Sequence, residues 1–325
     1  MNLFTAPARL ACRSRKAKTS RNRRKMTSDD PLLPSVFTLN NGTKMPAVGL
    51  GTYRIRNSEL LMKTVDYALG AGYRMFDTAA VYGNEVHLKN ALNCLLPKYG
   101  LMREDIFITT KLSPADHGSP DVVNNAYKRS LDNLGLDYVD LYLVHFPGSA
   151  KIPAEDPRNP KLRDSTWAGM TKLYDDGLVN AIGVSNFNIR HLKDIMNCNH
   201  GVVPAVNQVE WHPYYHQKDL LKFCKQNDIL LQAYCSLGGT SASNTDLLDD
   251  PVVKKIAMKH EATCAQVLLV WAVQQDVAII PKSTNLGRIK ENITFNFKLT
   301  CEEIKALDAL GEHNIKYAWD PNTVA

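Results

Sequence analysis

The feature that most constrains this chain is an alternation of short apolar runs with longer helical patterns from residue 36 onward. Eight such runs have the length and composition of buried strands, and helical stripes or capping signals separate most neighbours. Strands that alternate with helices form right-handed βαβ units and a parallel sheet, so we expect an α/β protein. The predicted strands are Ala47–Leu50, Arg74–Asp77, Ile106–Lys111, Val139–His145, Val179–Ser185, Ala205–Glu210, Ile229–Tyr234 and Val277–Pro281.

Helix boundaries are marked by capping residues. Ser119-Pro120 predicts a helix start with Pro at the first helical position. Thr263-x-x-Gln266 and Thr300-x-x-Glu303 are capping boxes that precede apolar stripes. Gly311 is expected to end the last of these helices.

The number and size of these units favour a closed barrel. Eight βα units in about 250 residues match a (β/α)8 TIM barrel, and a doubly wound open sheet is the rival. A barrel places functional residues at the carboxyl ends of several strands. The longest irregular stretches, 147–164 and 236–250, would be loops on that face. Residues 36–43, which end in an Asn-Gly turn, predict an N-terminal β-hairpin.

No linker divides the body of the chain, so residues 31–325 are expected to form one domain after a disordered basic leader, residues 1–30. Residues 1–25 contain nine Lys/Arg and no acid. This segment is interpreted as a disordered extension, with a mitochondrial presequence or a nuclear signal at residues 21–25 as alternatives. The remaining 30 basic and 33 acidic residues give nucleic-acid binding by the fold no electrostatic support.

Cysteine usage and hydropathy restrict the cellular setting. The seven cysteines are irregularly spaced and contain no C-x-x-C, which favours a reducing compartment over a disulfide framework. No window approaches the run of about 20 apolar residues that crosses a membrane. We therefore expect a cytoplasmic protein, or a mitochondrial one if the leader is a presequence.

Polar side chains end three of the predicted strands. Asp77 ends the second strand, Lys111 the third and His145 the fourth, and Tyr82 follows Asp77 by five residues. Each alone is also typical of a surface or core position. Together, at one barrel mouth, they form a specific set suited to proton transfer to a carbonyl oxygen.

The chemistry of the set assigns a task to each member. A free tyrosine, with a pKa of about 10, is a poor proton shuttle near neutral pH. Because a neighbouring ammonium favours the phenolate, Lys111 is expected to lower the pKa of Tyr82. Asp77 keeps the lysine charged, and a neutral His145 can hydrogen-bond and orient the carbonyl oxygen.

Eight short motifs occur in order along residues 36–325: Gly49–Tyr53, Gly72–Ala79, Tyr82–Glu85, Thr110-Lys111, Asp140–His145, Ile182–Phe187, Asn207–Pro213 and Ile280–Ser283. With these motifs the chain resembles an aldo-keto reductase, and it resembles compact, glyoxal-reductase-like members more than long-tailed steroid enzymes. The resemblance implies a (β/α)8 barrel that uses NADPH. It also implies that Tyr82 is the general acid, that Lys111 and Asp77 tune it, and that His145 positions the carbonyl.

The cofactor residues also come from the resemblance, because Gly49-x-Gly51 continues without the third glycine of a dinucleotide-binding fingerprint. Lys282, Ser283 and Arg288 at a helix start suit a phosphate dianion, although on the residues alone a solvated charged face is the alternative. The resemblance places Thr52 and Asp77 near the nicotinamide ribose, Ser185, Asn186 and Gln208 at the carboxamide, Tyr234 on the nicotinamide ring, Ser236 and Leu237 near the pyrophosphate, Lys282, Ser283 and Arg288 at the 2′-phosphate, and Glu291 and Asn292 towards adenine.

The substrate pocket departs from the family pattern. Tyr53 and Phe146, which with His145 are the expected substrate contacts, stand where many members have Trp, and Ser113 replaces an aromatic residue. These departures predict a pocket poor in indole rings. Small-molecule carbonyls are the expected partners, with neither nucleic acid nor membrane, and a monomer is expected.

Two alternatives to this interpretation remain open. The first is a non-catalytic NADPH-binding protein on the same fold, with a structural or regulatory role. The second is a nucleic-acid binder that acts through the basic leader, residues 1–25. Metal sites are disfavoured by the sequence. Pro213 lies between His212 and His216, and His260-Glu261-x-x-Cys264 lacks a second histidine. We therefore predict no metal.

Overall fold

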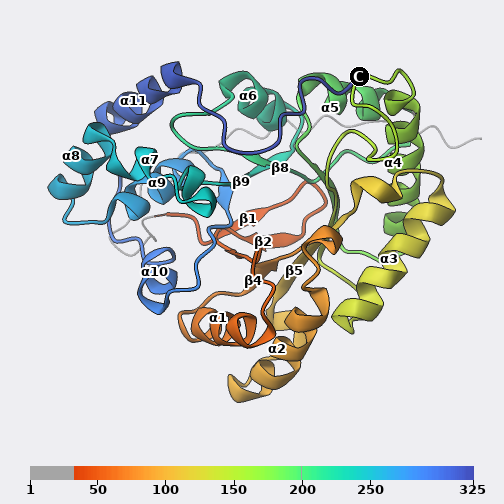
Figure 1. The fold of residues 1–325 in the computed structure, drawn as a ribbon, viewed down its shortest axis with the longest axis horizontal. Coiled ribbons are helices and arrows are strands. Elements are labelled where there is room, and N and C mark those ends of the chain that lie inside the picture. Colours follow the sequence, from red (N-terminus) through yellow and green to blue (C-terminus); the bar gives the residue numbers. More distant parts are fainter. Residues whose placement is uncertain (1–32, 199) are drawn as a thin grey trace, which may run out of the picture. The chain divides into compact units, whose positions relative to one another are not determined.

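Eight parallel strands form one sheet, in which each strand pairs with its neighbours in chain order (Figure 1). The computed structural model describes residues 33–198 and 200–325, so the predicted leader, residues 1–30, lies outside the described residues. Each predicted strand overlaps an observed one. The strands are β3 (Leu50–Gly51), β4 (Met75–Asp77), β5 (Phe107–Leu112), β6 (Leu141–Val144), β7 (Ile182–Ser185), β8 (Val206–Glu210), β9 (Leu230–Tyr234) and β10 (Ala278–Ile279).

The first and last strands meet and close the sheet. The amide of Gly49 donates to the carbonyl of Ile279 at 2.9 Å, and the amide of Ile279 donates to the carbonyl of Ala47 at 2.9 Å. Val48 and Ile279 form a parallel bridge at the same place. The chain is therefore a (β/α)8 barrel, and the rival open sheet is excluded.

Helices connect successive strands around the barrel (Figure 1). They are α1 (Ser58–Gly70), α2 (Glu85–Lys98), α3 (Pro120–Leu134), α4 (Asn159–Asp175), α5 (Ile189–Asn197), α6 (Lys218–Gln226), α7 (Asp246–Asp249), α8 (Pro251–Lys259), α9 (Cys264–Val273), α10 (Leu286–Glu291) and α11 (Cys301–Ala309). Short 3-10 helices are η1 (Ala80–Tyr82), η2 (Arg103–Asp105), η3 (Pro114–Asp116), η4 (Gly239–Ala242) and η5 (Leu310–His313). Both predicted capping boxes are present, at the starts of α9 and α11.

Three boundary predictions were wrong. The stretch 147–164 is irregular only as far as residue 158, because α4 starts at Asn159 with a Pro in its first turn. The stretch 236–250 contains η4 and α7. Gly311 does not end the last helical segment, because η5 continues through it and Asn314, with a φ of 47°, adopts the left-handed conformation instead.

The amino-terminal end of the barrel is covered by the predicted hairpin, β1 (Val36–Thr38) and β2 (Lys44–Pro46). The side-chain amide of Asn40 donates to the carbonyls of Val203 and Pro204, which precede β8. Leu39 and Met45 pack into the apolar cluster that fills the barrel interior, and a larger cluster lies between strands and helices. The carboxyl ends of the strands are thus the open end.

No helix in residues 33–198 and 200–325 has the length and apolar character needed to span a membrane.

Candidate active site

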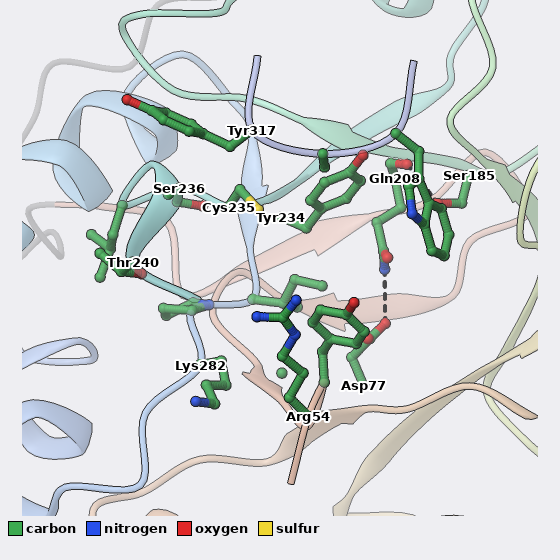
Figure 2. A pocket seen from close by; sticks show the side chains of 18 of the residues that line it. Arg54, Asp77, Ser185, Gln208, Tyr234, Cys235, Ser236, Thr240, Lys282 and Tyr317 are labelled. Atoms are coloured by element: carbon green, nitrogen blue, oxygen red, sulfur yellow. Dashed lines mark hydrogen bonds between the residues drawn. The ribbon is translucent and has the colours of Figure 1, made fainter. Parts of the chain in front are cut away.

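A cavity of about 400 Å³ opens at the carboxyl ends of the strands (Figure 2). Asp77, Ser185, Gln208 and Tyr234 line it, and they come from β4, β7, β8 and β9. The predicted catalytic residues Tyr82 and His145 line the same cavity. The barrel thereby brings residues that are far apart in sequence to one mouth, as the strand-end argument predicted.

Lys111 lies behind the cavity wall, where its side chain is fully buried. Its ammonium lies 2.6 Å from Asp77 Oδ1, donates to the carbonyl of Thr78 at 2.8 Å, and lies 3.4 Å from the hydroxyl of Tyr82. These three oxygens match the three protons of the ammonium. Burial lowers the pKa of Lys111, while the charge of Asp77 opposes that shift.

The loop that presents Tyr82 is fixed by a buried amide that sequence reasoning missed. Asn84 accepts a hydrogen bond from the hydroxyl of Thr78 at 2.7 Å. It also donates to the carbonyls of Thr52 and Ile55, both at 3.0 Å. Gly83, with a φ of 67°, lets the chain turn from η1 into α2. The tyrosine is therefore held on a short, constrained segment.

The pKa of Tyr82 is shifted in the direction opposite to our expectation. Burial raises this pKa well above 10, and the negative charge of Asp77 adds to the rise. The ammonium of Lys111 does not reverse the shift, because Asp77 lies closer to it, at 2.6 Å against 3.4 Å for the tyrosine hydroxyl. Tyr82 is thus a neutral phenol near pH 7, the form that can give up a proton.

His145 follows β6 and faces the tyrosine, with ring centroids 5.6 Å apart. Burial lowers the pKa of His145 well below 6.5, and the nearby Lys111 lowers it further. The ring is therefore neutral at pH 7, as expected. A neutral imidazole can donate one hydrogen bond to a substrate oxygen.

One side of the cavity carries a network of amides and hydroxyls. The side chain of Gln208 donates to Asp77 Oδ2 at 2.8 Å, the contact drawn in Figure 2. Asn186, with a φ of 65°, donates to the carbonyl of His145 at 2.9 Å and accepts from the hydroxyl of Tyr234 at 2.5 Å. Ser185 donates to the carbonyl of Gln208 at 2.8 Å. Such groups suit a carboxamide, which both donates and accepts hydrogen bonds.

The other side of the cavity is cationic. Arg54 and Lys282 both line it, and Figure 2 shows Lys282 and Ser185 on opposite sides. Partial burial and the charge of Arg54 lower the pKa of Lys282. The cavity therefore has amides and hydroxyls at one end and cations at the other. This arrangement fits a nicotinamide nucleotide, whose carboxamide ring would lie at the amide end and whose phosphates would lie at the cationic end.

The carboxyl-terminal tail completes the cavity, and sequence reasoning missed its contribution. Glu210, at the end of β8, is fully buried and accepts hydrogen bonds from the backbone amides of Tyr317 and Ala318, at 2.5 and 3.0 Å. Trp319 lies over His145, with ring centroids 5.5 Å apart, and edge-on to Phe146. The expectation of an indole-poor pocket therefore needs correction, because the tail supplies an indole ring.

The predicted site residues divide into two groups. Tyr53 and His145, from the predicted substrate contacts, line the cavity. Eight of the predicted cofactor residues also line it: Asp77, Ser185, Asn186, Gln208, Tyr234, Ser236, Leu237 and Lys282. Thr52, Ser283, Arg288, Glu291, Asn292 and Phe146 are not among the lining residues. Phe146 reaches the site through Trp319, and Arg288 lies exposed on α10.

Known proteins share this architecture over most of the chain. Residues 47–312 match the model of the aldo/keto reductase family. The human aldo-keto reductase family 1 member C2 is 42% identical, with 86% of this chain and 92% of that protein covered. The 9,11-endoperoxide prostaglandin H2 reductase of Trypanosoma cruzi is 40% identical, with 85% and 91% covered. The uncharacterized oxidoreductase YtbE of Bacillus subtilis is 39% identical, with 89% and 97% covered.

Solved structures agree with the sequence comparisons. An aldo-keto reductase from a Medee basin deep-sea metagenome library superimposes with a TM-score of 0.79 at 37% identity, covering 89% of this chain and 99% of that one. An aldo/keto reductase from Brucella melitensis gives a TM-score of 0.75 at 38% identity, covering 86% and 99%. The chain therefore belongs to the aldo/keto reductase family.

Proposed function

We propose that this chain is an NADP-dependent alcohol dehydrogenase-type enzyme that reduces aldehydes and ketones to alcohols. The observation that supports the proposal best is the chain of contacts from Asp77 through Lys111 to the hydroxyl of Tyr82, at the wall of an open cavity. It joins a proton donor to a fixed buried cation beside a neutral imidazole.

Each residue has one task in the proposed reaction. His145 donates a hydrogen bond to the carbonyl oxygen and orients it, and Tyr82 gives that oxygen its proton. Lys111, 3.4 Å from the tyrosine hydroxyl, stabilises the phenolate left behind. The chemistry supplied by a bound nicotinamide is hydride transfer to the carbonyl carbon. Ser185, Asn186 and Gln208, together with the ring of Tyr234, hold the nicotinamide in place.

Replacing Tyr82 by Phe tests the proton donor. We expect Tyr82→Phe to bind NADPH about as tightly as the wild type and to lose at least about a hundredfold in kcat, because general acid catalysis contributes roughly that much. Loss of NADPH absorbance with a panel of small oxo-aldehydes, nitrobenzaldehyde and a ketosteroid measures turnover, and quenching of tryptophan fluorescence measures cofactor binding.

Tyr53→Phe is the matched control, because Tyr53 also lines the cavity but takes no part in the contact between Lys111 and Tyr82. Full activity of Tyr82→Phe would refute the assignment of the acid. Tight NADPH binding by the wild type, with no turnover on any carbonyl, would instead favour the alternative of a non-catalytic cofactor-binding protein.

We propose NADPH rather than NADH, on the basis of the cationic end of the cavity. Lys282 with Ser283 and Arg288 would bind the 2′-phosphate, and Arg54 adds positive charge nearby. Lys282→Ala is expected to raise the KM for NADPH about tenfold or more and to change the KM for NADH little, since a charged hydrogen bond contributes about 1.5–3 kcal/mol. Lys290→Ala, on the exposed side of α10, is the control, and an equal effect on both cofactors would contradict the proposal.

We further propose that the protein acts as a cytoplasmic monomer. All six cysteines of the described ranges are free thiols, which is typical of a reducing compartment. Fractionation of cells that express the chain with and without residues 1–25 tests the location and the mitochondrial alternative. Light scattering on the purified chain tests the oligomeric state.

A further inference from the structure

A second group of chemically active side chains lies away from the cavity. Asp164 belongs to α4, Cys198 directly follows α5, and His200 lies on the segment that leads from α5 into β8. Helices α4 and α5 pack against each other (Figure 1). None of the three residues is among those that line the cavity, so the group is separate from the candidate active site.

The three side chains converge on one point. Within residues 33–198 and 200–325, they form the one set of three or more His, Cys, Asp and Glu side chains whose ligand atoms all lie close enough to share an ion, within 4.8 Å of one another. His200 Nε2 lies 2.6 Å from Asp164 Oδ1. The aspartate and histidine side chains are 42% and 27% exposed, so solvent reaches the group.

Carboxylate oxygen, thiolate sulfur and imidazole nitrogen are the ligands that zinc takes in proteins, at about 2.0–2.3 Å. A hard cation such as Mg²⁺ would not select a thiolate. We propose that Asp164, Cys198 and His200 form a site for one zinc-class divalent cation, with water as the fourth ligand. The partial exposure of the group leaves room for that water.

Binding would involve small changes in protonation and position. The thiol of Cys198 donates to the carbonyl of Asp194 at 3.0 Å, so it must turn from that bond and release its proton to water. His200 must bind through Nε2 as the neutral Nδ1–H tautomer. The two negative ligands and the dication then sum to zero charge. A carboxylate and a thiolate side by side repel each other, and the cation removes that repulsion.

A cysteine nucleophile is the other interpretation of a Cys-His-Asp group, and it is disfavoured. A nucleophilic cysteine needs a base within hydrogen-bond reach of its thiol. Here the thiol of Cys198 donates to the carbonyl of Asp194 at 3.0 Å, and His200 Nε2 lies 2.6 Å from Asp164 Oδ1 instead. The group is therefore suited to a cation rather than to thiol chemistry.

The consequence would be stability rather than catalysis. A cation held by these ligands ties the end of α5 to α4 and fixes the segment that enters β8. Ligands that bind only the folded state raise its stability. None of the three ligands is among the residues that line the cavity. We therefore expect zinc to raise Tm and to leave the reductase reaction unchanged.

Titration of the full chain with Zn²⁺ and with Co²⁺ tests the site. We expect one equivalent of Zn²⁺ to bind in competition with a chromogenic chelator. The Co²⁺ form should show the intense near-ultraviolet band of a thiolate-bound cobalt ion. Cys198→Ser should abolish the band and weaken Zn²⁺ binding at least tenfold, and His200→Gln should weaken it similarly. Cys94→Ser, an exposed cysteine on α2, is the matched control and should change neither.

Thermal unfolding provides a readout independent of spectroscopy. Zn²⁺ should raise Tm of the wild type and of Cys94→Ser, and it should leave Tm of Cys198→Ser and His200→Gln unchanged. Circular dichroism checks that both site variants are folded without metal. If Zn²⁺ binding or the cobalt band persists in both folded site variants, the ion is held elsewhere and the proposal is wrong.

Discussion

At the scale of single residues, the site depends on one buried ion pair. Lys111 is fully buried and Asp77 nearly so, and 2.6 Å separates their charged atoms. Such a pair need not stabilise the fold, because taking both charges out of water costs about as much as their attraction returns. Removing one partner is different, because the other charge is then buried without compensation.

Asp77→Asn is therefore expected to lower the free energy of unfolding by about 3–5 kcal/mol and to reduce kcat strongly. The asparagine keeps the size of the side chain but leaves the ammonium of Lys111 without its counter-charge. Urea unfolding and NADPH oxidation measure the two effects. Asp66→Asn removes one partner of a partly exposed pair with Lys98 and should cost far less. Equal losses in the two variants would contradict the argument.

The tyrosine shows what sequence reasoning can and cannot reach at this scale. Residue types and strand-end positions were enough to predict that Asp77, Tyr82, Lys111 and His145 meet. The direction of the pKa shift of Tyr82 could not be predicted from the sequence. It depends on how deeply the phenol is buried and on whether Lys111 lies closer to Asp77 or to Tyr82. Asn84 was missed for a similar reason, since its three hydrogen bonds reach chain segments up to 32 residues away.

At the scale of elements, strands were predicted well and the tail was not. A strand buried on both faces needs a short apolar run, and that run is visible in the sequence. The tail after η5 carries no periodic pattern. Its position is set by Glu210, which lies 107 residues before Tyr317 in the sequence. The carboxylate of Glu210 also accepts from the ammonium of Lys316 at 2.7 Å and lies 3.0 Å from Nε2 of His212.

Glu210→Gln tests this anchor. The glutamine amide is uncharged and accepts through one oxygen only. Both backbone donors of the tail therefore lose a charged acceptor, and at least one of them loses its acceptor altogether, at a cost of about 1.5–3 kcal/mol. We expect the KM for carbonyl substrates to rise several-fold with a smaller change in kcat, because Trp319 would no longer be held over His145. Faster proteolysis after residue 315 would report the loosened tail. An unchanged KM together with a released tail would show that Trp319 does not contact substrate.

At the scale of the whole molecule, the barrel buries several histidines in the neutral form. Burial lowers the pKa of His117 and of His191 to about 4, although each ring also lies near a backbone carbonyl that favours the charged form. His117 lies 3.0 Å from the carbonyl of Phe146, and His191 lies 3.1 Å from that of Val324. The two histidines therefore link the segment after His145 and the carboxyl-terminal tail to the stability of the fold in acid.

This arrangement predicts how stability depends on pH. The folded-state pKa of each ring lies below the unfolded value of about 6.5, so the unfolded chain takes up protons first as the pH falls. The free energy of unfolding is therefore expected to fall between pH 6.5 and 4, by at most about 1.4 kcal/mol per pH unit for each ring. Urea unfolding at half-unit pH steps measures the slope. His117→Gln, which can still donate to the carbonyl of Phe146, should flatten the slope. A free energy of unfolding that stays constant from pH 6.5 to 4 would refute the burial of these rings as neutral groups.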